Sequence, residues 1–180
     1  MALVEVQQFF PEEHPGHRKL QKWFTELAAT IKSRQDEETG VWWQVMEDSH
    51  PGEEGNFLEG SATAMFTWGF MKIIDLGYLD KDEYLQTVKD AYYGPLTNFV
   101  KFGPEGTIVY DTIVNECNLL GKVNLHVSTM CVWIRNRERA GIFLLSQQYY
   151  SSCPKISQGN NGVGPFMMAS YEWETWVEKA

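Results

Sequence analysis

The sequence is poor in the features that mark specialised classes of protein. Its 180 residues hold only three cysteines, at 117, 131 and 153, an odd number without C-x-x-C spacing. This pattern predicts reduced thiols and argues against a disulfide framework or a zinc site. Basic residues are also scarce, with 15 Lys and Arg against 24 Asp and Glu. The resulting net charge of -9 argues against nucleic acid or an anionic membrane as a partner.

Long apolar runs are missing as well. Charges and glycines interrupt every apolar stretch before it reaches the length of a membrane span. The amino end, MALVEVQQFF, lacks the basic and apolar regions of a signal peptide. Together with the thiols, these absences predict a cytoplasmic protein. Aromatic side chains, by contrast, are abundant, at 14% with seven Trp. Sugar-binding clefts and large helical cores are both rich in such rings, so composition leaves both open.

Helical periodicity alternates along the chain. Residues 17–35 and 81–100 each carry a single apolar stripe, although Pro95 should kink or end the second helix. Residues 59–78 and 164–178 are apolar on nearly every face, as in helices that other helices enclose. This alternation predicts an all-α fold, part of an α/α barrel whose enclosed helices form an inner ring. About five helices would make half of the toroid, with Met1–Val6 as the tail of another enclosed helix.

The helical pattern fails between about 103 and 160. Residues 107–110 look like a short strand, and the remainder of this segment is irregular. No linker or low-complexity segment divides the chain. We therefore expect residues 1–180 to belong to one domain, with no second domain.

Six short motifs, spread over nearly the whole chain, occur together in one order and at one approximate spacing. They are MALV at 1–4, PEEHP at 11–15, TGVWWQV at 39–45, GNFLE at 55–59, SATAMF at 61–66 and GVGPFMMAS at 162–170. In these motifs the chain resembles glycoside hydrolase family 105, the unsaturated rhamnogalacturonyl hydrolases. These are relatives of the family 88 unsaturated glucuronyl hydrolases. The resemblance covers only the carboxy-terminal half of the family's domain.

The resemblance implies an (α/α)6 barrel, the six-hairpin glycosidase fold. It also implies a substrate, the 4,5-unsaturated galacturonyl oligosaccharides that lyases release from pectin and rhamnogalacturonan. Enzymes of the family hydrate the vinyl ether double bond, with an aspartate as general acid, and need no metal or other cofactor. The resulting hemiketal opens the sugar and releases its glycosidic partner.

The family's catalytic aspartate, and a substrate-contacting R-x-G-N-G-W segment, lie in the half of the domain that precedes the equivalent of Met1. No catalytic residue is therefore assigned, and the chain alone is expected to be inactive. Residues 127–158 also depart from the family's glycine-rich pattern. The open edges of a half barrel would favour self-association. The alternative is a noncatalytic helical scaffold or a gene remnant.

Four residues are predicted to bind substrate: Trp42, Trp43, Glu59 and Ser61. The two tryptophans are adjacent, so one should face the core and the other the cleft or solvent, where its ring could stack on a pyranose. Glu59 and Ser61 stand at the start of an apolar helix. They are interpreted first as helix-start residues, with Asn56 as the cap and Glu59 three positions later, and second as contacts at the floor of the cleft.

Overall fold

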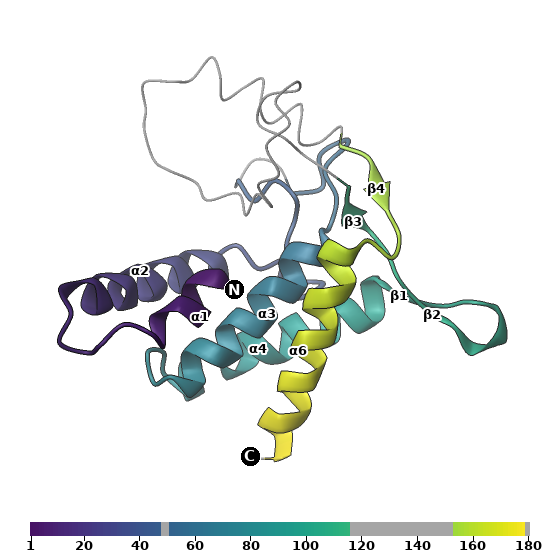
Figure 1. The fold of residues 1–180 in the computed structure, drawn as a ribbon. Coiled ribbons are helices and arrows are strands. Elements are labelled where there is room, and N and C mark those ends of the chain that lie inside the picture. The colour runs from purple at the N-terminus through teal and green to yellow at the C-terminus, as the bar shows by residue number, and fades with distance from the viewer. Residues whose placement is uncertain (48–50, 116–152, 179–180) are drawn as a thin grey trace, which may run out of the picture.

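The computed structural model describes residues 1–47, 51–115 and 153–178 (Figure 1). Within these ranges the chain forms five α-helices, and helical structure dominates, as the sequence predicts. They are α1 (Ala2–Gln7), α2 (Pro15–Lys32), α3 (Gly60–Asp75), α4 (Lys81–Asn98) and α6 (Asn160–Glu178). None of the helices in the described ranges is long and apolar enough to cross a membrane.

Side chains at the helix starts explain where the helices begin. His14 precedes α2, and its Nδ1 accepts a hydrogen bond from the backbone N–H of Gly16 at 3.0 Å. Pro15 then occupies the first helical position, where its missing N–H costs nothing. The α2 helix therefore starts two residues before the predicted position. Asp80 caps α4 by accepting from the backbone N–H of Glu83 at 2.8 Å.

The predicted alternation of outer and enclosed helices is confirmed for α2 and α3. In α2 only Phe24 and Ala28 are buried, whereas most of the 16 residues of α3 are. The α3 helix packs most extensively on α6 and then on α4 (Figure 1). Pro95 lies inside α4, which ends three residues later at Asn98.

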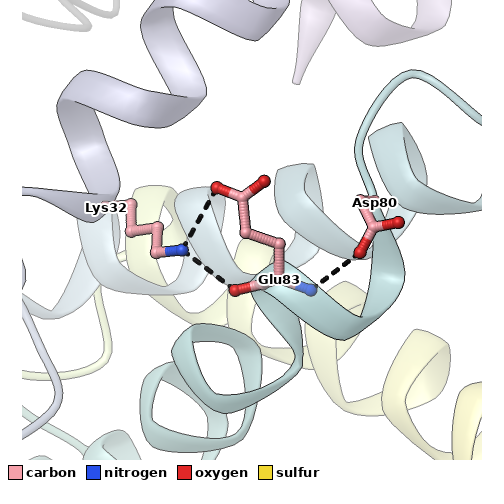
Figure 2. A network of polar contacts seen from close by, with 3 residues as sticks. All are labelled: Lys32, Asp80 and Glu83. Atoms are coloured by element: carbon pink, nitrogen blue, oxygen red, sulfur yellow. Dashed lines mark hydrogen bonds and ion pairs between the residues drawn. The ribbon is translucent and has the colours of Figure 1, made fainter.

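Polar contacts tie the outer helices together. Lys32, at the end of α2, donates to the backbone oxygen of Glu83 at 2.9 Å and to its carboxylate at 3.4 Å (Figure 2). The Lys32 ammonium also lies over the ring of Tyr84, 4.5 Å from its centre. Because these groups are largely exposed, we expect the network to orient the α2 terminus rather than to add much stability.

The α6 helix is enclosed on one face only, within the residues that the structure describes. Trp173 and Trp176 are buried, and the buried Glu172 pairs with Lys72 of α3 at 2.7 Å. On the opposite side, Met167 is 66% exposed and Tyr171 is 71% exposed. Packing within the described residues thus explains the apolar residues on one face of α6, but not those on the other face.

Two short antiparallel strand pairs lie in the described part of the 103–160 segment and in the residues just before it. Strands β1 (Val100–Phe102) and β2 (Ile108–Tyr110) pair across the 3-10 turn η1 (Pro104–Gly106), and β3 (Ile113–Val114) pairs with β4 (Lys155–Ile156). The predicted strand at 107–110 is confirmed, although it begins one residue later, at Ile108. Most of the divergent 127–158 segment lies outside the described residues.

The prediction of reduced thiols is wrong for Cys153, which is buried and disulfide-bonded. An odd number of cysteines argues against a complete framework, but it leaves room for one pair. Cys117 and Cys131 lie outside the described residues.

Candidate functional site

The candidate site lies at the amino end of α3, where three segments meet. The loop from Ser33 to Glu59 leads from α2 into this end, and β3 contacts α3 (Figure 1). The close approach of these segments is possible because Gly60 has no side chain. A Cβ there would lie 3.0 Å from the backbone oxygen of Asp111 and 3.2 Å from that of Thr112. Glycine thus allows the strand segment to approach the first turn of the helix.

Glu59 is the N-cap of α3, and its carboxylate is almost completely buried, at 1% exposure. It accepts hydrogen bonds from the backbone N–H of Ala62 and from the hydroxyl of Ser61, at 2.7 and 2.9 Å to its two oxygens. Its Oε1 also accepts from the backbone N–H of Val114 at 2.9 Å. These donors, together with the positive end of the helix dipole, stabilise the buried negative charge.

The backbone of Glu59 is fixed as firmly as its side chain. Its N–H donates to the carbonyl of Trp42 at 2.8 Å, and its carbonyl accepts from the hydroxyl of Thr63 at 2.7 Å. Glu59 therefore joins the loop, the helix and β3 in one network. The capping interpretation of Glu59 agrees with this geometry.

Asn56 was interpreted as the cap, and that assignment is wrong. The helix begins at Gly60, one residue after the predicted start at 59, so Glu59 takes the cap position itself. Asn56 instead brackets Val45: its Oδ1 accepts from the Val45 N–H, and its Nδ2 donates to the Val45 carbonyl, each at 3.0 Å.

Tyr110 closes the network from the strand side. Its hydroxyl donates to the carbonyl of Gly60 at 2.8 Å, and its ring stacks on Phe166 of α6 with 4.4 Å between centroids. Burial raises the pKa of the Tyr110 hydroxyl, and the nearby negative charge of Glu59 raises it further. The phenol therefore stays protonated and acts as a hydrogen-bond donor. Neither Tyr110 nor Val114 was singled out from the sequence.

Trp42 and Trp43 face opposite environments, as their adjacency predicts. Trp42 is fully buried, and its indole N–H donates to the carbonyl of Ile31 at 2.8 Å. Its ring packs edge-on against Phe66 and lies nearly parallel to Phe70. Trp42 therefore belongs to the hydrophobic core.

Trp43 is half-buried and lines a cavity of about 370 Å³ beside the loop. Its indole N–H donates to Oδ2 of Asp36 at 2.9 Å, while Oδ1 of Asp36 accepts from the N–H and hydroxyl of Thr39. Partial burial alone would raise the pKa of Asp36, but the hydrogen bonds from Thr39 and Trp43 outweigh it and lower that pKa. The carboxylate thereby fixes the plane of the indole ring.

Asp36 was missed from the sequence, although a signal was present. An aspartate three residues before Thr39, followed by Gly40, is typical of a turn in which the carboxylate accepts from the local backbone. The indole of Trp43 cannot be assigned to the same carboxylate from spacing alone. Within the ranges described, no three His, Cys, Asp or Glu residues are arranged to hold a metal ion.

Known proteins share this fold over nearly the whole chain. The structure of a family 105 glycoside hydrolase of C. acetobutylicum matches with a TM-score of 0.77 and 31% sequence identity. The match covers 97% of this chain and 43% of that one. A structure described as a possible family 105 member from Salmonella enterica matches with a TM-score of 0.67 at 20% identity, over 95% of this chain and 36% of its own. The fold class is therefore that of the six-hairpin glycosidases, as predicted.

Sequence comparison narrows this class to a family. The profile of Glycosyl Hydrolase Family 88 matches residues 1–177. The chain belongs to this family. It is also 29% identical over 175 residues to protein Atu3128 of Agrobacterium fabrum. The chain spans 66% of the length of that relative and less than half of the solved structures.

Proposed function

We propose that this chain forms the carboxy-terminal half of a glycoside hydrolase domain that acts on 4,5-unsaturated uronyl oligosaccharides, with galacturonyl products of pectin as the substrate class. Membership of family 88 over residues 1–177 is the observation that supports the proposal most directly. The complete domain would add water across the double bond, placing a proton on one carbon and a hydroxyl on the other. The hemiketal formed then opens and releases the glycosidic partner.

The proton would come from a carboxylic acid outside this chain. Glu59 is buried, and its oxygens accept hydrogen bonds from groups of its own chain. It is therefore poorly placed to approach an alkene carbon. In this proposal Glu59 and Ser61 shape the floor of the cleft by fixing α3 to β3. Their direct contact with substrate stays a prediction.

Trp43 is the residue of this chain that we propose to contact the sugar. Its ring borders a cavity, and its orientation is fixed by Asp36, so a pyranose could stack without the entropy cost of ordering the indole. Trp42 has no such access, because it is completely buried. The substrate contact predicted for Trp42 would thus be indirect, through support of the neighbouring loop.

The binding experiment compares Trp43→Ala with Trp23→Ala. Trp23 is half exposed on α2, away from the lining of the Trp43 cavity, so it serves as the matched control. Calorimetry with an unsaturated galacturonyl disaccharide should show that Trp43→Ala weakens binding at least tenfold, as loss of roughly 1.4 kcal/mol of stacking implies. Binding unaffected by Trp43→Ala, or no binding by the unaltered chain, would contradict the proposed role.

The activity experiment follows the ultraviolet absorbance of the unsaturated acid with purified protein whose mass is checked by light scattering. The chain alone should give no useful turnover, because it supplies no identified general acid. Turnover by a pure monomer would refute this expectation. Self-association and a cytoplasmic location likewise stay predictions.

A second candidate is a noncatalytic helical scaffold. The observation that favours it is the commitment of Trp42 and Glu59 to intramolecular contacts. A scaffold would bind no unsaturated disaccharide, and Trp43→Ala would then change only stability. The calorimetric comparison therefore separates the two candidates.

A further inference from the structure

The cavity beside Trp43 is lined mainly by negative charge. It encloses about 370 Å³ at the carboxyl end of α2 and the loop that follows. Three carboxylates and one guanidinium belong to its lining, those of Asp36, Glu37, Glu38 and Arg34. Within the residues that the structure describes, a ligand stacked on the Trp43 ring would therefore meet more negative charge than positive charge.

Asp36 is ionised at neutral pH. Its carboxylate accepts hydrogen bonds from the Trp43 indole at 2.9 Å and from the N–H and hydroxyl of Thr39 at 2.9 and 2.7 Å. Desolvation acts to raise the pKa of Asp36, but these hydrogen bonds together outweigh it and lower that pKa. Glu37 and Glu38 add two exposed carboxylates beside it. Protonation near pH 7 therefore does not remove the charge of Asp36.

The uncharged side-chain donors in the described lining are already used within the chain. The Ser33 hydroxyl donates to a backbone carbonyl of α2 at 2.8 Å. The amide of Gln35 donates to two backbone carbonyls, at 2.8 and 3.0 Å, and the Trp43 indole donates to Asp36. Arg34 aside, the side chains of this lining thus offer a ligand acceptor oxygens rather than donors.

A neutral sugar and a uronate differ in what they bring to such a surface. The hydroxyl groups of a neutral pyranose can donate hydrogen bonds to carboxylates. A uronate also carries a carboxylate, which only accepts hydrogen bonds and which the negative charge of the cavity repels. Both sugars have apolar ring faces that can stack on an indole. Stacking on Trp43 therefore does not discriminate between them, whereas the charge of the lining does.

We propose that the Trp43 cavity is a subsite for an uncharged sugar, the glycosidic partner that the reaction releases, and that it excludes the unsaturated uronyl residue. Selectivity is assigned to Glu37 and Glu38, whereas Asp36 orients the ring. The inference rests on the proposed function, because that function supplies the oligosaccharide. The uronyl residue would then lie outside the acidic lining, with the glycosidic bond leading out of the cavity.

The first measurement compares two ligands that differ only in charge. Digalacturonate is a 1,4-linked pair of uronates, and the corresponding digalactose has a hydroxymethyl group in place of each carboxylate. Calorimetry at low ionic strength should show that the chain binds digalactose about fivefold more tightly than digalacturonate. At roughly 1 M salt, where charges are screened beyond about 3 Å, this preference should shrink. Trp43→Ala should weaken digalactose binding about tenfold.

A charge-removing variant then tests whether the preference comes from the cavity. Glu37→Gln combined with Glu38→Gln keeps the size of two exposed side chains and should reduce the preference about threefold. Glu12→Gln combined with Glu13→Gln is the matched control, because it removes two charges from adjacent exposed residues outside the cavity lining. The 18 residues of α2, about 27 Å of helix, separate the two pairs. The control should leave the preference unchanged.

The outcomes separate this inference from the proposed function. Digalacturonate binding as tight as that of digalactose, or equal effects of the two double variants, would overturn the inference. So would a lack of digalactose binding, or digalactose binding that survives Trp43→Ala.

The unsaturated galacturonyl disaccharide is the separate probe of the function. If the chain binds it through Trp43 but does not prefer digalactose, the subsite assignment fails and the proposed function stands. If the chain binds digalactose through Trp43 but not the unsaturated disaccharide, the selectivity of the cavity stands and the proposed function fails.

Discussion

The amino end of α3 and the groove along its side contrast in how completely this chain satisfies them. At the amino end, the buried carboxylate of Glu59 receives donors from the helix and from β3, and Tyr110 closes the same network. Along the side, an apolar groove of about 260 Å³ between α1, α2 and α3 remains open, and Met167, Met168 and Tyr171 of α6 are exposed within the described residues. The chain thus satisfies the polar groups at the amino end of α3 with its own residues, but it leaves apolar surface beside this helix uncovered within the described ranges.

The largest expected effect tests whether the core beneath the site is complete. Trp42→Ala should lower the free energy of unfolding by about 3–5 kcal/mol, because it removes a fully buried ring that packs on Phe66 and Phe70. Trp43→Ala should cost roughly 1–2 kcal/mol, because Trp43 is only half-buried. Urea unfolding followed by circular dichroism measures both. Equal losses would contradict the division between a core ring and a cavity ring.

The next effect concerns the polar network at the amino end of α3. Glu59→Ala should lower the free energy of unfolding by about 2–4 kcal/mol, because it removes an N-cap and leaves the Ser61 hydroxyl and the Val114 N–H without their acceptor. Glu54→Ala is the control, since Glu54 is exposed, and it should change stability by less than about 0.5 kcal/mol. If both variants unfolded at the same urea concentration, Glu59 would not hold the site together.

A smaller change isolates one bond of the same network. Tyr110→Phe keeps the ring that stacks on Phe166 and removes only the hydroxyl that donates to Gly60. We expect a loss of about 1 kcal/mol, the usual net contribution of one buried hydrogen bond. Tyr171→Phe, on the free face of α6, is the matched control and should be close to neutral. A neutral Tyr110→Phe would mean that the hydroxyl bond to Gly60 contributes nothing measurable to holding the strand against α3.

The sequence predicts the parts of this contrast that depend on local pattern. Apolar residues on all faces of 59–78 indicate an enclosed helix, and the adjacent Trp42 and Trp43 indicate opposite environments. Position 59 is recognisable as part of a helix start, but the exact cap depends on the backbone at Gly60, which Asp111 and Thr112 approach. The Val114 and Tyr110 contacts join residues about 50 positions apart. No periodicity within one segment encodes such a pairing.

The groove could be expected from the sequence only in general terms. The sequence predicts open edges on a half barrel, and Met65 and Phe66 of α3 are indeed only half-buried within the described residues. Trp68 and Phe70 are buried, and Phe70 packs on Trp42 of the loop and on Tyr84 of α4. Exposed apolar residues lie instead on α6. Both faces of this helix are apolar in sequence, so the sequence alone does not show which face packs on α3.

The smallest expected effect is on the acid limb of stability. Hydrogen bonds, first that from Lys101 and then that from Ser157 at 2.7 Å, lower the pKa of Asp111 from 3.8 to about 2. Because the folded-state pKa is the lower one, this stabilisation is fully present above about pH 4 and is lost as the pH falls toward 2. Asp111→Asn should therefore reduce the difference between the urea midpoints at pH 6 and pH 2.5. The exposed Glu37→Gln should leave that difference unchanged.

Asp111 joins β1 to the segment after β4, so this effect concerns the strand region beside the amino end of α3. An unaltered acid limb in Asp111→Asn would show that the Lys101 pair is screened by solvent, and that packing rather than charge fixes the hairpin beside α3.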